Sequence, residues 1–334
     1  MASYAAAHAD PQGSGDARPT AQQIVQDNDL VGKLAGCVAV VTGSSSGIGV
    51  ETARALASTG IKLFLPVRDE AKAKAALSDS YVPERMEFVP MDLSSFESTR
   101  RAAGAILART DKINILVANA GVLGGGERKV SADGHELQFA ANHLSHFLLF
   151  QLLKPALLAA TTPDLQSRVV VVSSEAHRYA PLNETGNYSF EKGCYNQWLA
   201  YGQSKLANIY MASEIERRYS AEGLHANSVH PGVVVTDLGR NLSQEQAQAI
   251  IGNKDMAPYW KNTEQGAATT LWAAVDREWE GKGGKYLAQC AVAPLGDVAA
   301  DKGGALRAEH TYSPEHEARL WKDSLALVGL QDDA

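Results

Sequence analysis

The segment Cys37-Val-Ala-Val-Val-Thr-Gly-Ser-Ser-Ser-Gly-Ile-Gly49 carries the strongest structural signal in this chain. Its first half, up to Thr42, is short and rich in valine, which predicts a strand buried on both faces. The glycines that follow allow a tight turn and a close approach of the backbone to a phosphate group. A helix is predicted from Gly47 to Ser58, and its N-terminus would point amide groups at that phosphate. Strand, glycine-rich loop and helix in this order predict a dinucleotide-binding unit.

Apolar strands and helical patterns alternate along the rest of the chain. Further strands are expected at 61–67, 86–89, 113–118, 168–173, 224–229 and 285–287, and helices at 69–77, 94–109, 132–157, 200–218 and 264–275. This alternation predicts an α/β fold: a Rossmann-type, doubly wound and mostly parallel sheet of seven strands with helices on both faces. Pro66 cannot donate to a strand ladder, so a bulge or an early strand end is expected there.

The chain is expected to consist of an arm and one domain. Residues 1–33 form the arm: its composition up to about Pro19 is typical of disorder, and a short helix is expected from Ala21 to Leu30. Residues 34–330 contain neither an internal repeat nor a linker that would divide them, so they are expected to be a single nucleotide-binding domain.

Composition argues against several classes of protein. The 334 residues are 45% hydrophobic and 21% charged, as in ordinary globular proteins, and a net charge of −7 without a basic run argues against nucleic acid as a partner. No apolar run approaches the length of a membrane span, and the N-terminus lacks the apolar core of a signal peptide. Cys37, Cys194 and Cys290 are far apart and have no metal-binding spacing, so we expect a reducing, cytoplasmic location and no metal site.

A second signal is the segment Tyr201-Gly-Gln-Ser-Lys205. On a helix, this spacing places the two side chains on one face, one turn apart. A nearby ammonium favours the phenolate and lowers the pKa of a phenol, which makes the tyrosine a usable proton donor and acceptor. Tyr188 and Lys192 have the same spacing, so the spacing alone does not identify the reactive pair.

Taken together, these residues resemble the short-chain dehydrogenase/reductase superfamily over about residues 34–300. The glycine-rich loop, the acid after the third strand, the Asn-Ala-Gly segment after the fourth and the Pro-Gly segment after the sixth have the family's pattern. The resemblance and the expected strand ends together predict a cofactor site formed by Gly43, Ser45, Ser46, Gly47, Ile48, Gly49, Arg68, Asp92, Leu93, Asn119, Ala120, Gly121, Tyr201, Lys205, Pro231, Gly232, Val234 and Thr236.

The end of the second strand bears on the choice of cofactor. An acid at this place accepts hydrogen bonds from the ribose 2′-hydroxyl of NAD, whereas a cation accommodates the 2′-phosphate of NADP. Arg68 comes before Asp69 here, so NADP(H) is expected and NAD(H) is less favoured.

Three further segments are similar to the retinol-dehydrogenase-like branch of the family, near the WW-domain oxidoreductases. They are Ser-Ser-Glu-Ala-His-Arg from Ser173, Ala-Tyr-Gly-Gln-Ser-Lys-Leu-Ala-Asn from Ala200 and His-Pro-Gly-Val-Val-Val-Thr from His230. That branch carries an insertion between its serine and its tyrosine, as residues 175–200 would be here.

Tyr201 is therefore predicted to be the reactive tyrosine, although Tyr188 lies nearer to Ser174 in sequence. Gly193 interrupts any helix that would place Tyr188 and Lys192 on one face, whereas Tyr201 opens a run with a helical apolar pattern. The remaining aromatic residues of the insertion are expected either to line an apolar substrate pocket or to pack within their own loop. They are Tyr179, Tyr188, Phe190, Tyr195 and Trp198.

The resemblance implies a catalytic set of Ser174, Tyr201, Lys205 and Asn142. A hydride would pass between the nicotinamide and a carbonyl or alcohol carbon, with Tyr201 transferring the proton. Ser174 would polarise the carbonyl oxygen, Lys205 would lower the pKa of Tyr201 and hold the ribose, and Asn142 would hold a water that relays protons.

The resemblance implies that residues 238–262 form a mobile substrate lid; the alternative is an ordinary surface helix. The apolar residues of this segment favour a hydrophobic small-molecule substrate such as a retinoid, steroid, polyketide or other natural product. The resemblance also implies a homodimer or homotetramer. Two other functions stay open: a non-redox cyclisation, dehydration or epimerisation on the same scaffold, and a non-catalytic nucleotide-sensing protein.

Overall fold

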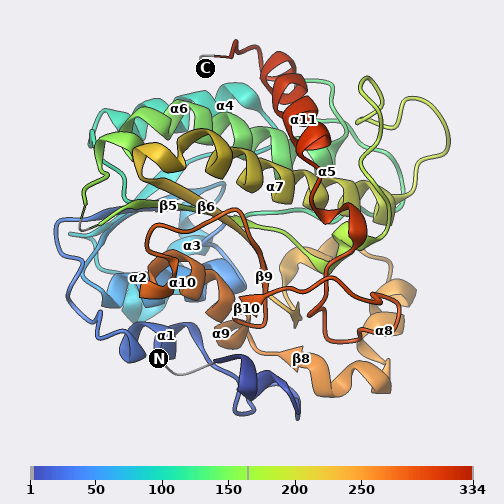
Figure 1. Cartoon of the computed structure of the whole chain (residues 1–334), viewed down its shortest axis with the longest axis horizontal. Coiled ribbons are helices and arrows are strands. Elements are labelled where there is room, and N and C mark those ends of the chain that lie inside the picture. Colours follow the sequence, from blue (N-terminus) through green and yellow to red (C-terminus); the bar gives the residue numbers. More distant parts are fainter. Residues whose placement is uncertain (1–3, 164, 333–334) are drawn as a thin grey trace.

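The protein, a computed structural model that describes residues 4–163 and 165–332, has a central sheet between two layers of helices (Figure 1). The described residues form an eight-stranded sheet in the order β10-β9-β6-β5-β4-β1-β2-β3. Its strands are β1 Val38–Val41, β2 Lys62–Val67, β3 Met86–Pro90, β4 Ile115–Ala118, β5 Ser167–Val172, β6 Leu224–His230, β9 Tyr286–Ala288 and β10 Ala291–Val292. A separate pair consists of β7 Val233–Val234 and β8 Trp260–Lys261.

The sheet confirms the doubly wound α/β prediction. Seven strands, β1 to β6 and β9, run parallel, and β10 adds an antiparallel edge. Between β1 and β4 the strand order reverses, and at such a switch point the loops diverge to opposite faces and leave a crevice.

Helices cover both faces of the sheet (Figure 1). One layer holds α4 Phe96–Leu107, α6 Ser145–Ala159, α7 Gln197–Tyr219 and α11 Pro314–Leu327. The other holds α1 Ala21–Asp27, α2 Ile48–Ser58, α3 Glu70–Leu77, α9 Thr263–Gly266 and α10 Ala268–Val275. The short α5 Leu137–Phe139 leads toward α6, and α8 Gln244–Ile251 lies in the predicted lid. No helix in the described ranges is long and apolar enough to cross a membrane.

Strand β1 illustrates why the sheet needs helices on both sides. Val38 and Val40 belong to the hydrophobic core beneath α4, α6 and α7, whereas Ala39 and Val41 belong to the core beneath α2 and α10. Successive side chains of a strand point to opposite faces, so a continuous apolar run is stable only when both faces are covered.

Two local predictions were wrong. The helix expected at 132–157 begins only at Leu137, after Glu136 has capped it by accepting the Phe139 amide, and residues 140–144 then form a π-helical segment before α6. Pro66 causes neither a bulge nor an early strand end. Its missing amide faces β1 beyond the last paired residue of that strand, and its carbonyl accepts the Gly43 amide.

The N-terminal arm lies against the base of the lid and α9 (Figure 1). Tyr4–His8 form a short 3-10 helix, and Arg18 is buried among backbone carbonyls. Disorder was expected up to about Pro19; the described part of the arm is instead bound in place by these contacts, while residues 1–3 lie outside the described residues.

Replacing Gly49 with alanine tests the close packing of the glycine-rich loop. A Cβ on Gly49 would lie 2.3 Å from the carbonyl oxygen of Gly43, so the loop must move to admit it. We expect Gly49→Ala to lower the free energy of unfolding by about 1–3 kcal/mol. Gly104→Ala in α4 is the matched control: nothing lies within 4 Å of its Cβ position, so the change should stabilise the helix by up to about 1 kcal/mol. Urea unfolding measures both, and equal effects would contradict the packing argument.

Candidate active site

A cavity of about 720 Å³ opens at the carboxyl ends of the parallel strands. The glycine-rich loop, the ends of β2 to β6 and the start of the lid line it. Every residue expected from the sequence to bind the cofactor contributes to its lining, and so does Ser174. Asn142, the fourth expected catalytic residue, does not line it but lies directly behind the wall.

The glycine-rich loop leaves a helix N-terminus free to face this cavity. Gly47 precedes α2 with φ +61°, a left-handed conformation that favours glycine, and no side chain caps the helix. The first amides of α2 are therefore left for a ligand, and the helix dipole favours an anion there. Asn119, also on the cavity wall, has a buried Oδ1 without a hydrogen-bond partner among the described residues. The residues present therefore fit a dinucleotide.

Thr42 joins the loop after β1 to the loop after β4. Its hydroxyl accepts hydrogen bonds from the amides of Asn119 and Ala120 at 2.9 and 3.0 Å, and its carbonyl accepts the Asn119 side chain at 2.8 Å. The same hydroxyl is 2.9 Å from His146 Nε2, whose ring also contacts the carbonyl of Asn142 through Nδ1. Both cofactor loops are thus held to each other and to the segment that carries Asn142.

Tyr201 lies on α7, and its side chain is buried at the cavity wall. Burial raises the pKa of its phenol well above the ordinary value, and a hydrogen bond with Ser174 acts in the opposite direction. Lys205 was expected to lower this pKa, but burial dominates in the structure. The phenol therefore stays protonated at neutral pH.

Lys205 follows one turn later on α7. Its Nζ lies 5.5 Å from the centre of the Tyr201 ring and donates to the Val172 carbonyl at 3.0 Å. Burial lowers the pKa of this ammonium to about 8, because the charged form has lost much of its hydration. An ammonium has three donors, so further donors can serve a ligand in the cavity.

Asn142 supports the site from behind. Its Oδ1 accepts the Val122 amide at 2.7 Å, and its Nδ2 donates to the Val122 carbonyl and to Ser204 Oγ. The side chain expected to hold a water is thus occupied in fixing the loop after β4 to α7. A Cβ on Gly121 would lie 3.3 Å from Asn142 Oδ1 and 3.5 Å from Lys205 Nζ. The lack of a side chain at Gly121 therefore lets its backbone pass close to both groups.

Tyr188 occupies a different environment. Its ring stacks on Phe139 with centroids 5.1 Å apart, and its hydroxyl donates to Asp323 at 2.6 Å. Of the aromatic residues in the insertion, Tyr195 lines the cavity, whereas Tyr179, Tyr188, Phe190 and Trp198 do not contribute to its lining. The Tyr188 side chain thus packs neither in the cavity wall nor within its own loop: its partners belong to α5 and α11.

The cavity wall around Arg68 contains a second cation that the sequence reasoning missed. Lys72 lines the cavity together with Arg68, and its Nζ bridges to Asp237 at 2.6 Å across the entrance. Asp69 also lines the cavity, and one oxygen of its carboxylate caps α3 by accepting the Lys72 amide. Lys72 follows Arg68 by four residues, which is the signal that could have identified it.

Part of the cavity wall carries apolar side chains, among them Leu123 and Leu238. Leu123, Ala176 and Tyr201 form a small hydrophobic cluster, against which Leu238 and Leu242 of the expected lid pack. Farther along the lid, Ile250 and Ile251 are exposed. Within the described ranges no group of histidine, cysteine or acidic residues could hold a metal ion.

A doubly wound parallel sheet with a glycine-rich loop at its switch point defines a Rossmann-type, nucleotide-binding class of α/β protein. Comparison with known proteins then gives the family. The model of the short chain dehydrogenase family matches residues 37–247. The chain therefore belongs to the short-chain dehydrogenase/reductase family of oxidoreductases, whose cofactor is a nicotinamide dinucleotide, and to its retinol-dehydrogenase-like branch.

Several relatives support this membership. The chain is 45% identical over 332 residues to the short-chain dehydrogenase/reductase prx1 of Penicillium rubens, covering 98% of this chain and 96% of that protein. It is 36% identical to the human WW domain-containing oxidoreductase, covering 82% of this chain and 66% of that protein. It is 34% identical to human polyprenol dehydrogenase, covering 88% and 86%. Among solved structures, the Pseudomonas aeruginosa RhlG/NADP active-site complex has a TM-score of 0.62 at 25% identity, covering 78% of this chain and 96% of that one.

Replacing Lys205 with methionine tests the cost of burying its charge. The unfolded ammonium keeps its proton up to its ordinary pKa of 10.5, but the folded one only up to about pH 8. Below pH 8 the folded state carries an unfavourable charge; between pH 8 and 10.5 it loses the proton first, so the wild type gains stability. Lys205→Met should therefore be more stable at pH 7, by up to about 3 kcal/mol, and this advantage should shrink toward pH 10.

Urea unfolding from pH 6.5 to 10 measures this difference. Lys192→Met is the control, because Lys192 is exposed and its loss should have the same small effect at every pH. A difference between Lys205→Met and wild type that does not change with pH would contradict the prediction.

Proposed function

We propose that this protein is an NADP(H)-dependent oxidoreductase that interconverts a carbonyl and an alcohol on a hydrophobic small molecule. One observation carries the proposal: Ser174, Tyr201 and Lys205 lie together at the wall of the cavity that all the expected cofactor residues line, and Ser174 is close enough to Tyr201 to act on the pKa of its phenol. A bound nicotinamide would supply or accept the hydride. The chain supplies the groups that hold the substrate oxygen and move its proton.

In reduction, Tyr201 donates its proton to the substrate oxygen while negative charge develops there. Ser174 hydrogen-bonds the same oxygen and orients it, which is a contribution of the oxyanion type. The raised pKa of Tyr201 suits this direction, because a phenol that stays protonated at neutral pH is a ready donor. The Lys205 ammonium, 5.5 Å from the ring, stabilises the phenolate that remains after the transfer.

The substrate is an apolar molecule with one reactive oxygen. Leu123 and Leu238 line the cavity, and Ala176 and Leu242 pack in the same hydrophobic cluster as Tyr201, so this part of the wall offers an apolar surface to a substrate. Two exposed isoleucines of α8, Ile250 and Ile251, extend this character along the lid. A relative named polyprenol dehydrogenase, whose name points to a long apolar alcohol, is in keeping with this substrate class.

NADP(H) is the better cofactor for the adenine side of the cavity. Arg68 and Lys72 line this side and can contact a 2′-phosphate. Asp69 lines it too, with one carboxylate oxygen used to cap α3. The neighbouring solved structure titled as an NADP complex supports the same choice.

The two tyrosines give a matched test of the proton donor. Tyr201→Phe removes the transferring hydroxyl and should reduce turnover by about 10²–10⁴-fold. Tyr188→Phe makes the same chemical change at the same spacing from a lysine but removes only the hydrogen bond to Asp323, so turnover should stay within about twofold of wild type. Absorbance at 340 nm with NADPH and a panel of apolar ketones and aldehydes measures both. Turnover without a change at 340 nm would instead support a non-redox reaction.

Removing the charge of Arg68 tests the cofactor preference. Arg68→Gln should weaken NADPH binding by about 10–100-fold, the loss of a hydrogen bond to a charged group, and leave NADH binding unchanged. Arg101→Gln, which removes an exposed arginine on α4 that pairs with Glu97, is the control and should change neither. Titration calorimetry gives the dissociation constants. Equal losses for both cofactors would contradict a 2′-phosphate contact.

A further inference from the structure

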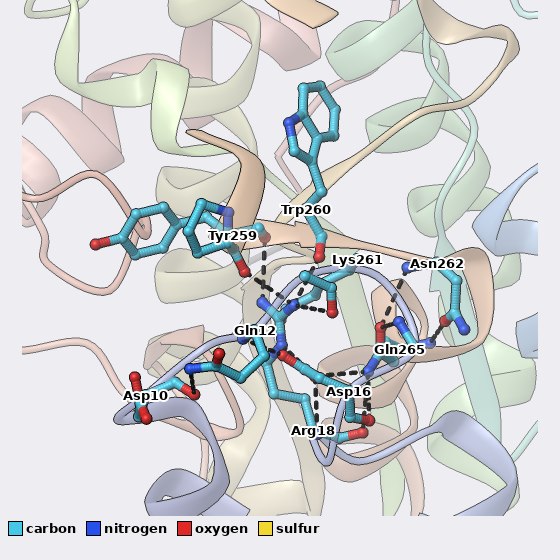
Figure 2. A network of polar contacts seen from close by, with 12 residues as sticks. Asp10, Gln12, Asp16, Arg18, Tyr259, Trp260, Lys261, Asn262 and Gln265 are labelled. Atoms are coloured by element: carbon cyan, nitrogen blue, oxygen red, sulfur yellow. Dashed lines mark hydrogen bonds and ion pairs between the residues drawn. The ribbon is translucent and has the colours of Figure 1, made fainter. Parts of the chain in front are cut away.

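The N-terminal arm carries a buried arginine that binds the segment 258–261 (Figure 2). These residues are the C-terminal end of the expected lid and are called the lid base here. Only 3% of the Arg18 side chain is exposed. Its guanidinium donates to the carbonyls of Pro258, Tyr259 and Trp260, at 3.3, 3.1 and 2.6 Å. The same group donates to the carbonyl of Gly13 in the arm and forms an ion pair with Asp16 at 2.8 Å.

This set of acceptors fixes the arm and the lid base relative to each other. A planar guanidinium presents its donors in a fixed geometry, so several carbonyls can be satisfied together only in one arrangement of the two segments. A buried charge that loses its partners is costly, so the contacts resist separation. The Gly13 amide adds a backbone hydrogen bond to the Pro258 carbonyl at 2.9 Å.

Gln265 at α9 makes a second connection to the arm (Figure 2). Its Oε1 accepts the Gly15 amide at 2.9 Å, and its Nε2 donates to the carbonyls of Asp16 and Arg18. The next residue, Gly266, is in tight contact with the cofactor side, since a Cβ there would lie 2.8 Å from Ile48 and 2.7 Å from Val234. The arm thus binds α9 through Gln265, and the next residue of α9, Gly266, packs against Ile48 and Val234 of the loops that line the cavity.

The lid base in turn holds the loop after β6. Strand β8 pairs with β7, so Trp260 lies beside Val233 and Lys261 beside Val234. Lys261 is buried, and its Nζ donates to the Pro231 carbonyl at 3.4 Å. A Cβ on Gly232 would lie 2.9 Å from the Lys261 side chain, so the lysine stem packs directly against that loop.

We propose that Arg18 is a positioning residue for the nicotinamide side of the cofactor site: through β8 and Lys261 it holds the Pro231–Thr236 loop against the cavity. The inference rests on the proposed function, in which this loop binds the nicotinamide half of the cofactor. Pro231, Gly232, Val234 and Thr236 all line the cavity, so a shift of the lid base moves that wall. A displacement of roughly 1 Å in a positioned group can reduce a rate about 100-fold.

The residues expected to bind the adenine half of the cofactor have no such contacts with the arm. Arg68, Asp92 and Lys72 lie on or beside β2, β3 and α3, and no recorded hydrogen bond or ion pair joins those residues to residues 10–18 within the described ranges. Loss of Arg18 should therefore affect the two halves of the dinucleotide unequally. A general loss of stability would affect them equally.

The test compares NADPH with 2′-phospho-ADP-ribose, which has the adenine half but no nicotinamide. In the full-length Arg18→Met variant we expect NADPH to bind about tenfold more weakly, while binding of the fragment stays within twofold. Arg18→Lys should recover part of the loss, because an ammonium can bind some of the carbonyls but not all of them together. Calorimetry at pH 7 gives each dissociation constant.

Arg168→Met is the matched control. Arg168 is also buried, with 7% of its side chain exposed, and it also binds a carbonyl, of Asp276, and an acid, Glu280. It lies at the start of β5, however, at the opposite end of the sheet from the cavity. This variant should lose stability without changing the ratio of the two affinities.

Hydrogen exchange separates failure of this inference from failure of the proposed function. Amides of residues 232–236 should exchange faster in Arg18→Met than in Arg168→Met, whether or not NADPH proves to be the cofactor. Equal exchange, or equal loss of affinity for NADPH and the fragment, would overturn the positioning role. If Arg18→Met does not fold, Gln265→Ala breaks the second connection and should give the same unequal loss. A wild-type protein that binds no NADPH would instead refute the proposed function.

Discussion

The hydrogen bonds around Thr42 are the constraint on which the cofactor cavity depends. A hydroxyl at the end of β1 binds two amides at the end of β4 and a histidine ring on the helix beyond. Neighbouring parallel strands end together, but the loops that follow them diverge, so something must hold those loops at a defined separation. Thr42 holds the two loops together at the end of β1, and Asn142 fixes the loop after β4 through its hydrogen bonds to the Val122 backbone. The cavity is therefore bounded by buried hydrogen bonds, which resist movement because an unpaired polar group in that position is costly.

At the reacting end, burial and charge act in opposite directions. Burial raises the pKa of Tyr201 and lowers that of Lys205, so each side chain is driven toward its neutral form. The sequence had predicted that the Lys205 ammonium would favour the phenolate of Tyr201 and so lower the pKa of that phenol. In the structure the phenol of Tyr201 keeps its proton, and the ammonium of Lys205 loses its proton at a lower pH than an exposed lysine would. Under the proposed function, this phenol would release its proton when negative charge develops on the substrate oxygen.

Much of the fold could be predicted from the sequence, because its signals are local, and the residues predicted to bind a cofactor do line one cavity. The valine runs of β1 and β5 identify strands that are covered on both faces, and the glycines after β1 identify the turn between strand and helix. The late start of the helix before Asn142 could not be predicted, because it depends on the Glu136 cap, whose Oε1 is also bound by Tyr195 from a distant loop. Pro66 is tolerated within a strand only because its neighbour β1 has already stopped pairing, which is a property of two strands and not of one.

By itself, then, the sequence determined the alternation of strands and helices and the glycine-rich loop, since these follow from periodicity and backbone sterics over a few residues. The prediction of Tyr201 over Tyr188 also drew on the family resemblance. Only the tertiary structure decided that Tyr188 packs on Phe139, that Lys72 joins Arg68 at the cavity, and that the arm binds the lid base through Arg18. Each of these contacts joins residues that are distant in the chain or meet only when the sheet and its two helical layers assemble. Their partners are backbone carbonyls, ring faces and cavity walls, which have no sequence signature of their own.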